Sequence, residues 1–121
     1  MKDLESHFQM VNRQFEVLFG ISRQEALGRT PSELFGDQFG KPLMRHDLEV
    51  IRRGIPLEFE EAVPQGDAQR TYLSIKFPLL DQTGKPYAIC AISTDITLQK
   101  AGEQALRARA QGRERPGTFG R

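Results

Sequence analysis

The spacing of apolar residues along the chain changes once, close to Gly54. Before this glycine, apolar side chains recur every three or four positions, which is typical of helices with one buried face. After it they recur every second position, which is typical of strands with one covered face. The pattern therefore predicts a helical first half and a sheet in the second half.

Several short helices are predicted between residues 12 and 36. Asn12 is a good cap for a helix that Gly20 ends. Ser22 with Glu25 forms a capping box for a one-turn helix, and the segment 30–33 (TPSE) repeats that device with proline at the first helical position. A longer helix is predicted over 37–54.

Five strands are predicted. Segments 2–4 and 8–11 are short and flank a polar turn, whereas 57–63, 71–79 and 86–96 are longer. Turn residues separate the three longer segments, which indicates antiparallel hairpins. The fold class is therefore α+β, with the helices on one face of a five-stranded antiparallel sheet.

The strands also predict which side chains face the helices. In 71–79 the apolar positions, Leu73 and Ile75 among them, are expected to face inward and Lys76 to face solvent. The last strand is apolar on both faces, which is typical of a central strand covered on both sides. Its outer residues predict a dimer interface: Ala88, Cys90 and Ile92.

This order of elements resembles a PAS domain, the small sensory module of bacterial histidine kinases, diguanylate cyclases and related signalling proteins. Four stretches carry the resemblance across roughly residues 1–100: KDLESHFQMVNRQFEVLFGIS, EALGRTPSELFG, DLEVIRRGIPLEFEEAV and TYLSIKFPLLDQTGKPYAICAISTDIT. The resemblance implies a PAS sensor domain at 1–97 and a C-terminal signalling helix at 98–111. Residues 112–121, which lack periodicity and are rich in arginine, are expected to form a disordered basic tail.

A triplet, Asp95-Ile96-Thr97, ends the last strand. PAS domains commonly carry such a triplet where the sheet passes into the helix that leads to the output domain. The resemblance implies that Asp95 and Thr97 fix the angle of this helix by hydrogen bonds to the backbone. Asp95 could instead serve only as a cap for the helix that follows.

The resemblance also implies a ligand pocket between the sheet and the longer helix, although the same residues could form a plain hydrophobic core. Asp47 could be a polar anchor for a cationic or hydroxylated ligand, a buried acceptor for Arg70 or a backbone N–H, or a surface or capping residue. Small residues on the last strand favour a cavity. The candidates are Phe15, Phe19, Phe35, Met44, Asp47, Leu48, Ile51, Phe59, Leu73, Ile75, Ile89, Ala91 and Ser93.

Haem and flavin are not expected, and no tightly bound cofactor is predicted. His46 lies on the longer helix, where haem-binding PAS domains carry their iron ligand, but its position on the helical wheel favours the surface. Light-sensing PAS domains need a cysteine on the short middle helix, where this chain has GRTPSELFG. The single cysteine, Cys90, excludes an internal disulfide and any zinc site built on cysteines.

Charge and composition argue against several classes of function. A net charge of +1 gives no bulk attraction to nucleic acid, and no apolar run is long enough for a membrane helix. Two histidines and scattered carboxylates give no spacing of nucleophile and base, so the chain is not expected to be an enzyme, whatever its parent protein does. We expect a cytoplasmic sensor module that binds a small ligand, dimerises, or does both, and signals to an output domain. The alternative is a ligand-free dimerisation module.

Overall fold

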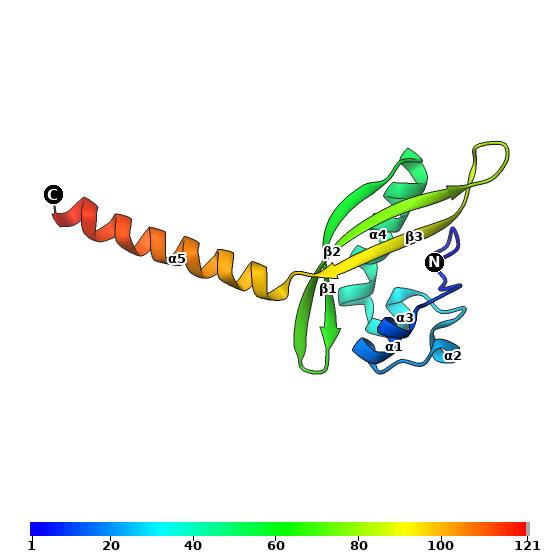
Figure 1. The fold of residues 1–121 in the computed structure, drawn as a ribbon, viewed down its shortest axis with the longest axis horizontal. Coiled ribbons are helices and arrows are strands. Elements are labelled where there is room, and N and C mark those ends of the chain that lie inside the picture. Colours follow the sequence, from blue (N-terminus) through cyan, green and yellow to red (C-terminus); the bar gives the residue numbers. More distant parts are fainter. Residues whose placement is uncertain (121) are drawn as a thin grey trace.

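The computed structural model describes residues 1–120, and their side chains through residue 110. Four helices precede three strands, and a fifth helix ends the described chain (Figure 1). The elements are α1 (Arg13–Phe19), α2 (Arg23–Ala26), α3 (Pro31–Phe35), α4 (Asp37–Arg53), β1 (Leu57–Gln65), β2 (Ala68–Leu80), β3 (Pro86–Asp95) and α5 (Thr97–Gly120).

The predicted helix starts are confirmed by their hydrogen bonds. The Asn12 side chain accepts from the first turn of α1 at 3.0 Å. Ser22 with Glu25, and Thr30 with Glu33, each form a complete capping box, in which two otherwise unpaired backbone donors are satisfied reciprocally. These local signals need no tertiary contact, which is why the sequence alone located the helices.

The sheet is antiparallel with the order β1-β2-β3, so the prediction of five strands was wrong in number. The two segments expected as N-terminal strands form only isolated bridges, from Lys2 to Phe8 and from Lys2 to Ile89. The cause is a tight turn between them. Ser6 has a left-handed φ of 66°, and the Asp3 carboxylate accepts the backbone N–H groups of residues 5 and 7.

Helices α1–α4 lie on one side of the sheet, with α1 and α4 in contact with its strands, and α5 projects away from the sheet (Figure 1). On the opposite face Ile75 pairs with Ile92 across β2 and β3, and these side chains are 46% and 63% exposed. The expected cover over this face is therefore not provided within residues 1–120. Ala88 is buried and Cys90 is half-buried at the other end of the same face.

Helices α3 and α4 approach each other at Gly40. A Cβ atom at this position would lie 2.3 Å from the Ser32 backbone, so only glycine fits. Gly40 therefore permits the close approach of α3 and α4.

Helix α5 begins at Thr97 and continues to Gly120, beyond the predicted end at residue 111. Of the tail expected at 112–121, residues 112–120 are helical, and residue 121 lies outside the described residues. None of the helices within residues 1–120 combines the length and apolar character needed to cross a bilayer.

Candidate functional site

A cavity of about 340 Å³ lies between the helical layer and the inner face of the sheet. This volume is within the range of small-molecule sites, which is about 300–1,000 Å³. Residues from the N-terminal segment, α1, α3, α4 and all three strands line it. Its wall has an aromatic part and a charged part.

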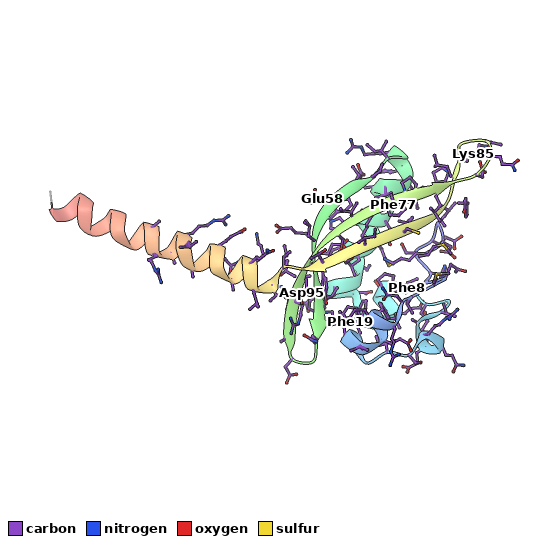
Figure 2. All side chains as sticks on the ribbon, in the orientation of Figure 1. Phe8, Phe19, Glu58, Phe77, Lys85 and Asp95 are labelled. Atoms are coloured by element: carbon purple, nitrogen blue, oxygen red, sulfur yellow. The ribbon has the colours of Figure 1, made fainter. Side chains whose placement is uncertain are left out.

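The aromatic part comes from the helical layer and from the N-terminal segment. Phe15 packs against Phe19 with ring centroids 4.9 Å apart, and Phe19 against Phe35 at 5.2 Å. Phe8 extends the cluster to Phe15 at 5.4 Å. Figure 2 labels Phe8 and Phe19 on the helical side of the sheet. Such tilted aromatic pairs contribute about 0.5–1.5 kcal/mol each beyond the burial of their area.

The charged part is centred on Asp47 of α4, which is 1% exposed. One carboxylate oxygen accepts from Lys76 Nζ at 2.9 Å, and the other from Lys2 Nζ and Ser6 Oγ at 2.9 Å each. Asp47 is therefore neither a surface residue nor a helix cap, and its cationic partners are lysines, not Arg70.

Lys76 of β2 is also 1% exposed, and its ammonium group has three acceptors. These are Asp47, the Leu43 carbonyl oxygen at 3.3 Å, and the Glu61 carboxylate at 2.6 Å. A buried ammonium is tolerated only when it is paired and hydrogen-bonded, and Lys76 meets both conditions.

The cluster shifts the pKa of two of its members. Burial alone would raise the pKa of Asp47, but Lys2 and Lys76 more than offset burial and hold this pKa below its usual value. Burial lowers the pKa of Lys2, because desolvation of its ammonium outweighs the attraction of Asp47.

Two hydroxyl groups complete the polar wall. Ser74 on β2 and Ser93 on β3 face each other across the strands with their oxygens 2.8 Å apart. Both line the cavity, beside Ala91 on the same face of β3. The small side chains at 91 and 93 leave part of this space open.

The cavity does not include His46. Its ring stacks on Phe59 with centroids 4.0 Å apart, and its Nδ1 lies 2.7 Å from Glu61 Oε2. Both His46 and Glu61 line a second, smaller hollow on the other side of the glutamate. Within residues 1–120 no three histidine, cysteine, aspartate or glutamate side chains gather in a way that could hold a metal ion.

The structure brings together seven of the thirteen residues expected around a pocket: Phe15, Phe19, Phe35, Asp47, Ile89, Ala91 and Ser93. The other six lie outside the cavity: Met44, Leu48, Ile51, Phe59, Leu73 and Ile75. On α4, the inward stripe passes through Leu43, Asp47 and Val50, which are buried, whereas Leu48 is 51% exposed. The candidates Met44, Leu48 and Ile51 each lie one position after a buried residue, because hydrophobicity alone does not place a charged residue on the inward face of a helix.

The inward face of β2 is the one that sequence reasoning assigned to solvent. Tyr72, Ser74 and Lys76 are buried and line the cavity, and Ile75 points away. The apolar face of β2 was taken as the core face, which is the usual rule for a strand with one side covered. A polar cluster in the core reverses that rule, and Lys2 was missed for the same reason.

At the end of β3, the predicted junction residues are joined by hydrogen bonds. Asp95 Oδ1 accepts the Thr97 backbone N–H at 2.9 Å and also the Thr97 hydroxyl. The Thr97 hydroxyl oxygen in turn accepts the Thr71 N–H of β2 at 3.0 Å. Hydrogen bonds from Thr97 and Arg70 keep the pKa of the Asp95 carboxyl below its usual value. Figure 2 labels Asp95 where the sheet meets α5.

Comparisons with known proteins agree on one family. A family model described as PAS fold matches residues 1–101. The aerobic respiration control sensor protein ArcB of Escherichia coli K12 is 25% identical over 103 residues, which cover 84% of this chain and 13% of ArcB. The chain thus spans only a small part of the length of such relatives.

Three solved structures show the same fold. The VqmA dimer of Vibrio cholerae has a TM-score of 0.70 at 25% identity, covering 81% of this chain and 45% of VqmA. The RpfR quorum-sensing receptor PAS domain of Cronobacter turicensis, in complex with BDSF, has a TM-score of 0.63 at 26% identity, with coverages of 79% and 89%. The BvgS PAS domain of Bordetella pertussis has a TM-score of 0.69 at 20% identity, with coverages of 92% and 85%.

Proposed function

Because the chain belongs to the PAS fold family, we propose that it is a sensory module that binds a small molecule in the cavity and relays binding to an output domain. The relay passes through Asp95 and Thr97 into α5. The parent protein of such a module is a signalling protein. ArcB is a parent protein of this kind, because it is a sensor protein and the segment that matches this chain is 13% of its length.

The observation that carries this proposal is the cavity wall. A plain core filled with well-packed apolar residues is often as stable as one with buried ion pairs, or more stable. This chain instead buries Lys76 and Asp47 beside an open volume. A wall with aromatic and charged parts suits a site that orients a ligand by a few polar groups. The RpfR domain, described in complex with BDSF, supports ligand binding in this family.

Hydrogen bonds link the cavity wall to the start of α5. Leu18 of α1 lines the cavity, and its carbonyl oxygen accepts from the Gln65 side chain at 3.5 Å. The Gln65 amide oxygen accepts from Arg70 Nε, and Arg70 Nη1 donates to Asp95 Oδ2 at 2.8 Å. A shift of α1 on ligand binding would therefore reach the residue that holds the first turn of α5.

Hydrogen exchange tests this relay. The amides of the first turn of α5 are compared in the chain as purified and after unfolding and refolding that strips bound molecules. We expect different exchange rates in the two states for the native chain, and equal rates in Arg70→Met, which lacks the guanidinium between Gln65 and Asp95. Arg53→Met at the exposed end of α4 is the matched control. Equal rates in the native chain, when a molecule has been removed, would contradict the relay.

A second candidate function rests on the exposed apolar face of the sheet. Ile92 is 63% exposed and lies beside Ile75, with Cys90 further along β3. A second copy of this chain is the occupant that we propose, because neighbouring apolar side chains exposed together on one face of a sheet mark an interaction surface. The similar VqmA structure is described as a dimer.

Molar mass by light scattering tests whether the chain forms a dimer through this face. Ile92→Glu should convert a dimer into a monomer and leave the cavity intact, because the side chain points away from it. Ala91→Phe should fill the cavity and leave the dimer intact. Gln82→Glu, in the exposed loop before β3, controls for added negative charge. A dimer unchanged by Ile92→Glu would contradict the interface.

A further inference from the structure

The polar wall around Asp47 leaves hydrogen-bond donors without an acceptor. Lys76 has no donor to spare, because its three N–H groups match the Leu43, Asp47 and Glu61 acceptors. Lys2 contacts a single acceptor among the described residues, Asp47, at 2.9 Å. Two of the three N–H groups of Lys2 therefore have no hydrogen-bond acceptor among the described residues, and its Nζ also lies over the Phe8 ring at the cavity wall, 5.0 Å from the ring centroid.

The serine pair adds a third donor. The two hydroxyl groups of Ser74 and Ser93 share one hydrogen bond at 2.8 Å, so one hydroxyl proton is left over. Both side chains line the cavity, and Ser74 is buried. A ligand group placed between the serine pair and Lys2 would thus meet donors.

The carboxylates of the wall are already engaged by cations. Both oxygens of Asp47 are hydrogen-bonded, and Glu61 Oε2 contacts Lys76 and His46. The remaining Glu61 oxygen has no hydrogen bond among the described residues, so it is the only rival anchor of opposite sign. A cation placed there would stand close to the Lys76 ammonium, and like charges at such distances repel.

We propose that the cavity binds a small acid, whose apolar body lies against the aromatic cluster and whose carboxylate is received by Lys2 and the serine pair. The proposal rests on the proposed function, since it names the ligand class of the same cavity. A carboxylate would also give the buried Lys2 ammonium a second hydrogen-bonded anion beside Asp47. The body is received by Phe15, Phe19 and Phe35.

Three probes with one body and different head groups test the ligand class: 4-phenylbutyrate, 4-phenylbutanol and 4-phenylbutylamine. Dissociation constants are measured by calorimetry on the full chain after removal of copurified molecules. The acid should bind about tenfold or more tightly than the alcohol, as a charge-assisted hydrogen bond implies. The amine should bind more weakly than the alcohol. Equal binding of acid and alcohol, or tightest binding of the amine, would overturn the proposal.

Two variants locate the head group. Lys2→Met keeps the apolar stem and should bring the acid down to the affinity of the alcohol, whereas Lys2→Arg should retain the preference. Lys41→Met, on an exposed turn of α4 outside the cavity, is the matched control. If Lys2→Met does not fold, the three probes on the native chain still decide the ligand class.

Different results would overturn the proposed ligand class and the proposed function. Ala91→Phe should abolish binding of whichever probe binds best. If the alcohol or amine binds best and Ala91→Phe removes it, the cavity is a ligand site and only the ligand class is wrong. If no probe binds, the ligand class is overturned. Detection of a different small molecule in the purified chain would then preserve the proposed function.

Discussion

Replacement of Asp47 by asparagine is the sharpest perturbation of the buried cluster. The substitution keeps the size of the side chain and removes one negative charge from a group that is 1% exposed. Lys76 would retain Glu61 at 2.6 Å, but Lys2 would lose the only carboxylate that it contacts among the described residues. The variant thus leaves one ammonium buried without a counter-charge.

The expected loss in the free energy of unfolding follows from what it costs to bury an ammonium group without its partner. Removal of one partner from a buried ion pair typically costs about 3–5 kcal/mol. We expect the lower end, about 3 kcal/mol, because the asparagine oxygen still accepts one hydrogen bond and Glu61 still neutralises Lys76. With a urea m-value of about 1–3 kcal/mol/M, the midpoint of unfolding should fall by about 1–3 M.

Urea unfolding followed by far-UV circular dichroism measures this change, since the chain has no tryptophan. Asp67→Asn, the same substitution in the exposed β1–β2 turn, is the matched control and should change stability by no more than about 0.5 kcal/mol. A midpoint for Asp47→Asn within the error of the Asp67→Asn value would refute the argument that Asp47 holds the cluster together.

The pH dependence of stability tests the same carboxylate. The pKa of Asp47 is lower in the folded chain than its ordinary value of 3.8. Its contribution to stability is therefore fully present above the unfolded pKa, and it is lost as the pH falls through the lower folded pKa. The native chain should lose stability more steeply than Asp47→Asn below about pH 4. Parallel profiles of the two proteins would show that other carboxylates dominate.

Three further changes test packing and the junction. Gly40→Ala should destabilise the chain, because its Cβ would lie 2.3 Å from the Ser32 backbone; an unchanged melting temperature would contradict this close approach. Gly102→Ala meets nothing within 4 Å on α5 and should raise helicity by circular dichroism, with a gain of up to about 1 kcal/mol; no gain would argue against a helix there. Thr97→Val loses the acceptor of the Thr71 N–H and should speed exchange of that amide, at a cost of about 1 kcal/mol, whereas unchanged exchange would remove Thr97 from the junction.

The local signals in the sequence carried most of the fold. Caps such as Asn12 and Thr30 act through their own neighbours in the chain, so they specify helix starts without tertiary context. Two of the three long strands follow from alternation, and the last follows from a run that is apolar on both faces. The two N-terminal strands failed because a pair of short segments can also be held by a side-chain turn, here that of Asp3.

The lining of the cavity was predictable only at positions where an apolar residue faces the interior. Phe15, Phe19 and Ile89 were placed by their hydrophobicity, and they line the cavity. Lys76 and Ser74 were assigned to the wrong face because their burial depends on partners remote in sequence. Lys76 and Asp47 are far apart in the sequence and lie on different elements, so the periodicity of either element does not indicate that they form a pair. The one indication in the sequence was Asp47, a charged residue near the centre of the apolar stripe of α4.

If the cavity holds a small molecule, native mass spectrometry of the freshly purified chain should detect it. A spectrum of the same sample under denaturing conditions gives the mass of the bare chain. We expect an additional mass in the native spectrum that disappears on denaturation and is absent from Ala91→Phe. The same additional mass in Ala91→Phe, or a bare chain that binds none of the three probes after purification, would contradict it.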